Sequence, residues 1–156
     1  MQTVVDTDFL SAFFKINRVG LIYEAMETDK LCVTQAVFEE LTKAPFFDRL
    51  VERMEKIELI RIDKLHKNVQ SSKLGKGELE SISYALETNS ILLTNDKKAG
   101  EFAEDLRIKV LDIVSFLLLC KEIELISVDD IKNIMFSLNK YDYMEFSQEQ
   151  RKLLLR

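Results

Sequence analysis

Four acidic residues are spaced so that an α/β fold would direct them into one polar pocket: Asp6, Glu40, Glu78 and Asp96. Asp6 ends the apolar run 3–5, and Asp96 follows the run 91–95, which is apolar at its start. Both runs are typical of buried parallel strands that end near a carboxylate. Because open parallel sheets bind ligands beyond the carboxyl ends of their strands, we expect both aspartates to be functional. Acids at this position indicate metal-dependent chemistry.

The two glutamates stand out by helical phase, since successive residues advance by about 100° around a helix axis. Glu40 falls inside the apolar arc of its helix, whereas Glu39 points the other way. In a later helix Glu78 lies beside apolar residues, whereas Glu80 and Glu87 fall on the opposite side. A carboxylate on a core-facing stripe needs a partner, because burying an unpaired charge is very costly. We therefore expect Glu40 and Glu78 to join the aspartates.

Polar neighbours of the strand ends fit supporting roles. Thr7 and Thr94 could donate a hydrogen bond to a carboxylate or orient a water molecule, and Asp8 and Asn95 could hold a metal through water. The alternative for all of them is ordinary helix capping.

A locally basic stretch precedes Glu78, with Asp63 as its one acidic residue between positions 61 and 76. Such a stretch could guide a phosphate backbone to the acids, and a solvated loop is the alternative. The lysines after Asp96 would neutralise phosphate or form an exposed first helical turn. The possible nucleic-acid contacts are Lys64, Lys67, Lys73, Lys76, Lys97 and Lys98.

Composition bounds the class of protein. A chain of 156 residues with 47% apolar content can bury one real core. The net charge of -5 argues against a protein that coats DNA without sequence preference, but it permits a nuclease with a local basic patch. With only His66, Cys32 and Cys120, no Cys/His zinc site can form. Any metal must be held by oxygen, which favours one or two ions of Mg²⁺ or Mn²⁺.

The number of cysteines and the length of the apolar stretches also indicate the cellular compartment. The two cysteines are too few for a disulfide scaffold, so we expect both to be small core residues in a reducing cytoplasm. The N-terminus enters a strand-like run at once, which is unlike a signal peptide. The longest apolar stretch, 114–120, is far shorter than the roughly 20 residues of a membrane helix. We therefore expect a cytoplasmic, soluble protein with no membrane partner.

Strand-like runs at 3–6, 31–34, 57–62, 90–94 and 108–111 alternate with helix-length segments. This alternation predicts a three-layer α/β/α sandwich with a mainly parallel five-stranded sheet. Thr34 is the expected N-cap of a helix at 35–43, and Pro45 suits the first turn of a helix at 46–54. Further helices are expected at 9–16, 19–26, 77–85, 113–121, 128–138 and 147–155. We expect a nuclease-like domain of residues 1–126 and a C-terminal helical extension, 127–156, packed on the same domain.

The chain resembles a PIN domain, the family of small metal-dependent nucleases that includes the VapC-like ribonuclease toxins of toxin-antitoxin pairs. The resemblance spans about residues 3–112 in matching order and spacing. Gly77-Glu78, with the helical tail, resembles a prokaryotic subgroup that has Gly-Glu at the third acidic position. The motifs that carry the resemblance are Val4-Val5-Asp6-Thr7-Asp8-Phe9-Leu10, Val37-Phe38-Glu39-Glu40-Leu41, Leu74-Gly75-Lys76-Gly77-Glu78 and Leu93-Thr94-Asn95-Asp96.

The resemblance implies that Asp6, Glu40, Glu78 and Asp96 are the catalytic, metal-binding acids. It also implies an RNA substrate cut to 5'-phosphate and 3'-hydroxyl ends, an antitoxin protein whose peptide fills the acidic pocket, and a homodimer. Two positions depart from the family pattern. Asp8 stands where the family often has Asn, which adds charge near the metal. Asn95 stands where close relatives often have Asp, which removes a secondary ligand.

Three hypotheses follow for the function. The first is a metal-dependent endoribonuclease that hydrolyses phosphodiester bonds of single-stranded RNA. The second is a haloacid-dehalogenase-like phosphatase, because Asp6-Thr7-Asp8 also resembles the Asp-x-Asp signature of that family, although Glu40 and Glu78 are then unexplained. The third is a PIN-fold interaction module without catalysis.

Overall fold

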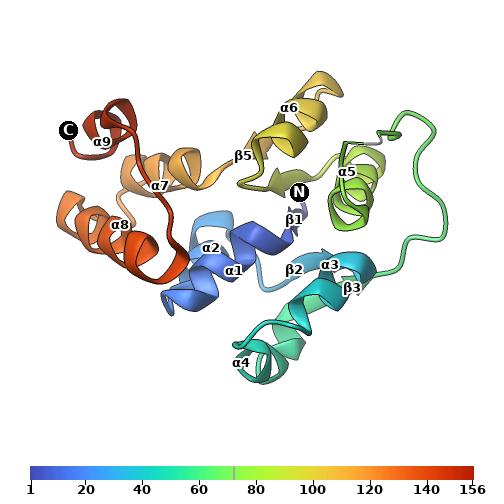
Figure 1. The fold of residues 1–156 in the computed structure, drawn as a ribbon, viewed down its shortest axis with the longest axis horizontal. Coiled ribbons are helices and arrows are strands. Elements are labelled where there is room, and N and C mark those ends of the chain that lie inside the picture. The colour runs from blue at the N-terminus through green and yellow to red at the C-terminus, as the bar shows by residue number, and fades with distance from the viewer. Residues whose placement is uncertain (72) are drawn as a thin grey trace.

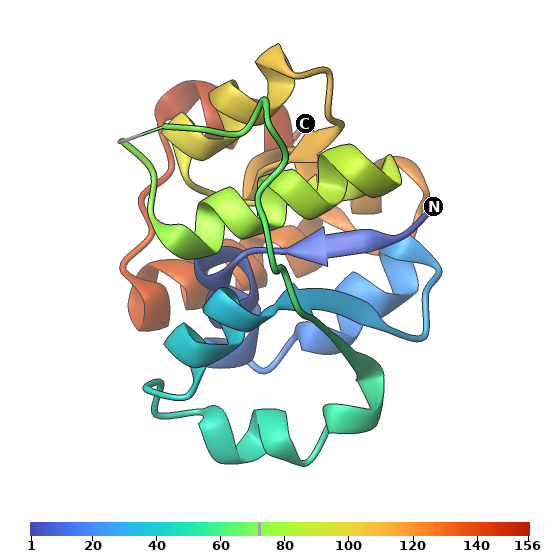
Figure 2. The ribbon, with the colours of Figure 1, turned by 90° about the vertical axis from the view of Figure 1, so that its right-hand side faces the viewer.

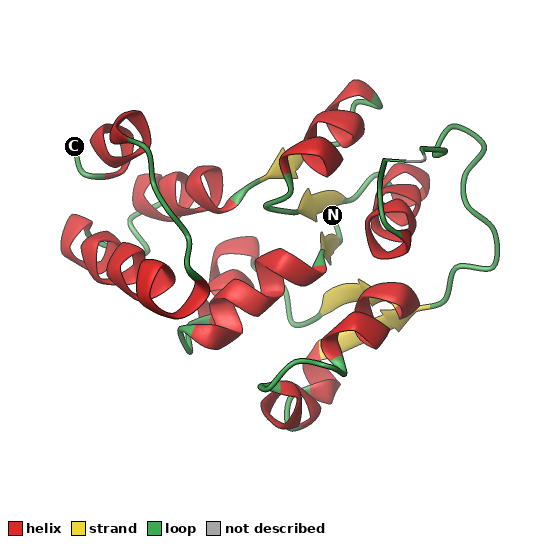
Figure 3. Cartoon of the chain, viewed as in Figure 1, coloured by secondary structure: helices red, strands yellow, loops and turns green. Residues whose placement is uncertain are grey.

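A parallel sheet forms the centre of the molecule in the computed structural model, which describes residues 1–71 and 73–156. Its strand order is β3-β2-β1-β4-β5, and every neighbouring pair is parallel. Helices and strands alternate along the chain (Figures 1 and 3). The prediction of a parallel five-stranded sheet is therefore confirmed. The strands are β1 (Thr3–Val5), β2 (Leu31–Thr34), β3 (Ile57–Ile60), β4 (Ile91–Leu93) and β5 (Val110–Leu111).

Strand β1 is central because both of its faces are apolar and buried. Val4 packs with one core cluster and Val5 with the other, and each is fully buried. The register pairs Val5 with Leu93 of β4, and the backbone N–H of Asp6 extends the ladder to the Leu93 carbonyl at 2.9 Å. The chain builds outward from β1 to β3 and then crosses to β4 on the other side of β1. The strand order thus reverses between β1 and β4, where sheets of this kind open a crevice.

Helices cover both faces of the sheet, which completes the three layers (Figure 2). On one face, α5 (Lys76–Thr88) and α6 (Lys97–Asp105) pack against Val4 and Leu92. On the other, α1 (Thr7–Lys15) and α7 (Ile113–Glu122) join through the rings of Phe9, Phe13 and Phe116, whose centroids lie 5.3 to 5.4 Å apart. The remaining helices before α5 are α2 (Val19–Met26), α3 (Gln35–Leu41), α4 (Phe47–Val51) and the 3-10 helix η1 (Met54–Lys56).

The C-terminal helices α8 (Val128–Asp142) and α9 (Gln148–Leu154) pack on α1 and α7. Lys15 Nζ lies 2.8 Å from Asp142 Oδ1, which joins α1 to the end of α8. Lys121 Nζ donates to the carbonyls of Leu153 and Leu154 at 3.2 and 3.1 Å, which joins α7 to α9. The tail therefore packs on the helices that flank the sheet. The boundary after residue 126 stays a prediction.

The start of α8 offers a test of how firmly the tail is held. Ser127 Oγ accepts from the Asp130 N–H at 3.1 Å, and the Asp130 carboxylate accepts from the Ser127 N–H at 2.9 Å. We expect Ser127→Ala to lower the free energy of unfolding by about 1 kcal/mol, or roughly 2–4 °C in Tm. Ser127→Asn, which keeps a capping oxygen, should lose much less. Equal melting temperatures for all three proteins would contradict this role of the cap.

Some element boundaries differ from the prediction, for local reasons. The segment predicted as one helix at 46–54 divides into α4 and η1, and Pro45 precedes the α4 N-cap, Phe46, instead of standing in the first turn. Strand β5 begins at Val110 because the Ile108 N–H bonds to the Ala103 carbonyl at 3.1 Å and Arg107 has a φ of 65°. Helix α6 was not among the predicted helices; its segment is mostly polar, and its buried residues are the small Ala99, Gly100 and Ala103.

Cys32 and Cys120 are buried and free, which confirms them as core residues. Burial raises the pKa of the Cys32 thiol to about 11 and that of Cys120 to about 12, so both are neutral at physiological pH. Across residues 1–71 and 73–156, none of the helices has the length and apolar content to cross a bilayer.

Candidate active site

Asp6 lies at the carboxyl end of the central strand and is almost fully buried, with 4% of its surface exposed. It is the N-cap of α1, and its Oδ1 accepts from the Thr7 N–H at 2.8 Å. The parallel register brings Thr94 alongside, and Thr94 Oγ1 donates to Asp6 Oδ2 at 3.1 Å. Both carboxylate oxygens of Asp6 are therefore fixed by the two strand ends that meet at the switch point.

Asp96 follows β4 in the same way and is the N-cap of α6. Its Oδ1 accepts from the Ala99 N–H at 2.8 Å, in the first turn of that helix. The Asp96 N–H donates to Thr94 Oγ1 at 3.3 Å. Thr94 thus bonds to both aspartates, as a donor to Asp6 and an acceptor from Asp96.

Glu40 reaches this place from α3, but it is not buried. The expectation of a core-facing Glu40 is wrong, because the residue sits at the exposed C-terminal end of a seven-residue helix. Its Oε2 accepts from Thr7 Oγ1 at 2.6 Å, so the side chain is directed toward the residue that follows Asp6.

Glu78 stands in the first turn of α5 and is half-buried. Burial raises its pKa, and the negative charges of Asp96, Asp8 and Glu40 raise it further, against the backbone hydrogen bond from Gly75. These repulsions show that Glu78 faces the same region as the acids from the strand ends and from α3.

Asp8 belongs to the group as a fifth acid. The residue as a whole is exposed, but protein atoms surround its carboxylate, whose Oδ1 accepts from the N–H groups of Phe9 at 2.8 Å and Asn95 at 3.5 Å. Burial raises the pKa of Asp8, and the charge of Asp96 adds to the effect. Asn95 Oδ1 accepts from the Ile113 N–H at 3.1 Å, so this oxygen fixes the start of α7.

The electrostatics of the site are expressed most strongly at Asp6. Burial raises its pKa from 3.8 to about 7, and the charge of Asp8 is the next largest cause, with a smaller contribution from Glu78. The hydrogen bonds from Thr7 and Thr94 oppose this rise. A buried acid that remains partly protonated near neutral pH is typical of functional sites.

The donor set fits a hard divalent cation by its chemistry, since the five acids of the site offer carboxylate oxygen. Mutual repulsion among these acids is what a cation would relieve. In this arrangement, among residues 1–71 and 73–156, no three acidic, His or Cys side chains are close enough together to hold one ion.

Glu80 was expected on the polar side of α5, and this expectation is wrong. Glu80 is 6% exposed, and its Oε1 accepts from the Ala36 N–H at 3.0 Å. Helix α3 packs against α5, so the polar arc of α5 faces protein at Glu80, whereas Glu87 on the same arc is exposed. The predicted cap of α3, the Thr34 hydroxyl, is buried without a partner and makes no capping bond. Glu80 thus accepts a hydrogen bond at the start of α3, where Thr34 was the predicted cap. Because Glu80 reaches α3 only through tertiary packing, no signal in the sequence could have predicted this contact.

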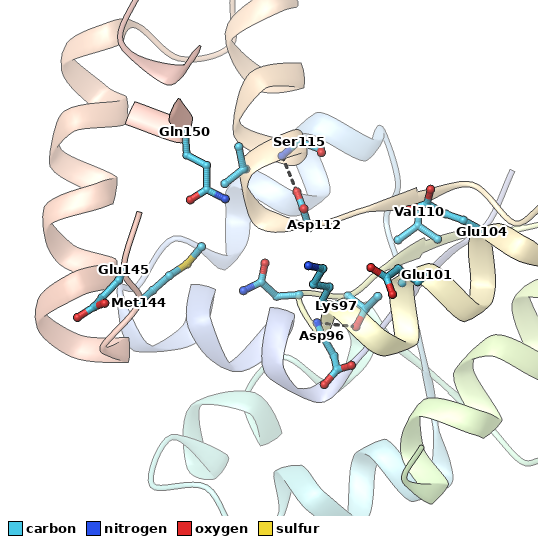
Figure 4. A pocket seen from close by; sticks show the side chains of 14 residues that line it. Asp96, Lys97, Glu101, Glu104, Val110, Asp112, Ser115, Met144, Glu145 and Gln150 are labelled. Carbon is cyan, nitrogen blue, oxygen red and sulfur yellow. Dashed lines mark hydrogen bonds between the residues drawn. The ribbon is translucent and has the colours of Figure 1, made fainter. Parts of the chain in front are cut away.

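An acidic cavity of about 470 Å³ adjoins the site beside Asp96 (Figure 4). The Asp96 carboxylate is directed away from Glu145 and Gln150, which lie across the cavity. Sequence reasoning missed this cavity, because packing of the segment after α8 supplies one of its walls. Its charged lining residues are Asp96, Lys97, Glu101, Glu104, Asp112 and Glu145.

The structure brings two of the six candidate nucleic-acid lysines together. Lys73 and Lys98 line a cavity of about 500 Å³ with Phe102. Lys97 instead lines the acidic cavity. The other three, Lys64, Lys67 and Lys76, are exposed.

Comparisons with known proteins agree with this geometry. A family model described as a PIN domain matches residues 2–156. A solved PilT N-terminus domain protein from the hyperthermophilic archaeon Sulfolobus solfataricus P2 is similar at 20% identity and a TM-score of 0.54, over 74% of this chain and 90% of that chain. A domain of a functionally unknown protein from Methanocaldococcus jannaschii is similar at 20% identity and a TM-score of 0.46, over 72% of this chain and 90% of that one. No curated protein matches the chain.

The family model spans nearly the whole chain, and the Sulfolobus structure shares its fold. The strand order, with acids at the ends of β1 and β4, fits the resemblance noted in the sequence. The chain belongs to the PIN domain family, whose members are generally metal-dependent nucleases.

Proposed function

We propose that the protein is a Mg²⁺- or Mn²⁺-dependent endoribonuclease that hydrolyses phosphodiester bonds of single-stranded RNA. The observation that carries the proposal is the meeting of five carboxylates at the switch point of a parallel sheet. They come from the ends of two strands and from three helices, and the charges of neighbouring acids help to raise the pKa values of Asp6, Asp8 and Glu78. Acids placed in this way repel a phosphate backbone unless a cation is present.

Asp6, Glu40, Glu78 and Asp96 would hold one or two ions directly or through water, with Asp8 beside them. A bound ion supplies a nucleophile by lowering the pKa of attacking water and stabilises the leaving oxygen of an in-line displacement. Thr94 holds Asp6 and the Asp96 backbone, and Thr7 holds Glu40, so both hydroxyls orient acids. Lys73 and Lys98 would attract the RNA backbone from the side of α6. Products would carry 5'-phosphate and 3'-hydroxyl ends.

Cleavage of a fluorescent single-stranded RNA by the purified protein tests the proposal. We expect cleavage with Mn²⁺ or Mg²⁺, none with EDTA, and little on the same sequence as a duplex. Cleavage that persists in EDTA would contradict the metal requirement. Binding of RNA without cleavage under every condition would favour the interaction module.

Asp8→Asn separates the nuclease from the phosphatase. In the nuclease Asp8 adds charge beside the ligands, so we expect RNA cleavage to fall about tenfold to a hundredfold and to remain measurable. Removing the Asp8 charge should also lower the pKa of Asp6, because that charge is the second largest cause of its rise. In the phosphatase Asp8 would be essential, and Asp8→Asn would abolish turnover of a generic phosphate ester. Membership of the PIN family favours the first outcome.

The acidic cavity supports a further proposal about partners. A small antitoxin protein could place an arginine among Glu101, Glu104 and Glu145, next to Asp96. Inhibition of cleavage by a short arginine-containing peptide, relieved by salt, is the expected result.

A homodimer could use the tail helices, where Phe136 of α8 is 69% exposed. Sedimentation equilibrium would measure that association.

A further inference from the structure

Helix α5 does more for the site than present Glu78. Two more of its residues, Gly77 and Glu80, are buried where α5 lies beside α3, the helix that carries Glu40 (Figure 2). We propose that Gly77 and Glu80 are positioning residues that together fix the Glu40 carboxylate at the active site. The inference rests on the proposed nuclease function and names how one of its ligands is held.

Gly77 makes room for the carboxylate. A Cβ atom at this position would lie 2.6 Å from Glu40 Oε1 and 3.3 Å from Val37 Cγ2, and the first of these is closer than real Cβ atoms approach other groups. The described glycines include none with positive φ, so backbone freedom does not explain a glycine here. Glycine is a poor helix former, and its presence in the first turn of α5 is explained by this close approach.

The Glu40 carboxylate is therefore bounded on two sides. Its Oε2 accepts from Thr7 Oγ1 at 2.6 Å, and its Oε1 lies over the space that Gly77 leaves open. A Cβ atom at position 77 therefore requires the Glu40 carboxylate, the far end of an exposed side chain, to shift from the position that its bond with Thr7 defines.

Glu80 contacts the N-terminal end of α3, the helix that carries Glu40. Its Oε1 accepts from the Ala36 N–H at 3.0 Å, in the first turn of α3, where the Thr34 side chain makes no capping bond. Helix α3 has only seven residues, so its position depends on tertiary contacts more than on its own propensity. Glu80 thus sets the N-terminal end of α3, and Gly77 sets the space for Glu40 near its C-terminal end.

Mn²⁺ affinity measured by calorimetry, without RNA, tests the proposal. Gly77→Ala should weaken binding by about tenfold or more, as loss of a ligand's support does. Gly20→Ala is the matched control, because Gly20 is also the second residue of its helix and a Cβ there meets nothing within 4 Å. Glu80→Met should weaken Mn²⁺ binding, whereas Glu80→Gln, which keeps an acceptor for the Ala36 N–H, should retain it.

A Glu40→Ala background decides whether these effects pass through Glu40. There, Gly77→Ala and Glu80→Met should each change the Mn²⁺ affinity by less than about twofold. The same loss of affinity in both backgrounds would overturn the proposal.

Failure of the proposed function would look different, because the wild-type protein itself would bind no Mn²⁺. The contact between Gly77 and Glu40 can then be tested by thermal melting alone. Gly77→Ala should change Tm less favourably in the wild-type background than in the Glu40→Ala background, where the close contact with Glu40 Oε1 is gone and alanine favours the helix. Equal shifts of Tm in both backgrounds would overturn the positioning role independently of any metal.

Discussion

Asp6→Asn should lower metal-dependent RNA cleavage by at least about a hundredfold, because a bound ion supplies several kcal/mol of transition-state stabilisation. The fold should survive the change. The amide oxygen that the substitution introduces can still accept from the Thr7 N–H, which in the wild-type protein reaches Asp6 Oδ1 at 2.8 Å. Thr94 Oγ1 donates to the other carboxylate oxygen, and a hydroxyl can instead accept from an amide N–H. Cleavage assays and circular dichroism on the same preparation measure both effects.

The control for this substitution is Asp48→Asn, the same chemical change at an exposed residue in the first turn of α4. It should leave both cleavage and the circular dichroism spectrum as they are in the wild-type protein. If Asp6→Asn cleaved RNA as fast as Asp48→Asn, the assignment of the metal site would be wrong.

The strand ends of the site could be predicted because they depend on local patterns. Short apolar runs that are followed by an acid define β1 and β4. Parallel pairing of the two strands then brings Asp6 next to Thr94. The positions of Glu78 and Thr7 follow almost as directly, since each stands in the first turn of a helix that begins near the sheet.

Helical phase predicted the burial of the glutamates less reliably. Whether one side of a helix is buried depends on the elements that pack against it, and the sequence of the helix alone does not show these. Glu40 lies on the apolar arc of α3 and yet is exposed, because α3 ends one residue later. Glu80 lies on the polar arc of α5 and yet is buried, because α3 packs there. The first error comes from the end of a helix, and the second from the contact between two helices that are far apart in the chain.

The acidic cavity could not be predicted for a related reason. Its wall after α8 depends on how the tail returns over α1 and α7, and the contacts that direct this return, such as Lys15 with Asp142, join residues more than a hundred positions apart. Amphipathic periodicity indicates that α8 must pack on something, but it does not say on what.

The stability of the metal-free protein should fall as pH rises from about 4 to about 7. Asp6 has a pKa raised from 3.8 to about 7, mainly by burial, so between these values the folded state binds more protons than the unfolded state. Under that condition the free energy of unfolding decreases with pH. Asp6 makes no contribution to the free energy of unfolding at pH values below its pKa in the unfolded state. At pH values above its pKa in the folded state, it lowers the free energy of unfolding by its full amount, on the order of 4 kcal/mol. The raised pKa values of Asp8 and Glu78 act in the same direction.

Urea unfolding at several pH values, with and without Mn²⁺, measures this linkage. Mn²⁺ at a hundred times its dissociation constant should add about 2.7 kcal/mol at pH 7.5. It should add less at pH 5, because protons compete with the metal for the acids. Asp6→Asn cannot titrate at this position, so its profile should decline less between pH 4 and 7, with Asp8 and Glu78 as remaining causes of the decline. The difference between the two profiles isolates Asp6 from the other ionisable groups. A wild-type profile that coincides with that of Asp6→Asn would show that burial of this acid does not strain the metal-free fold.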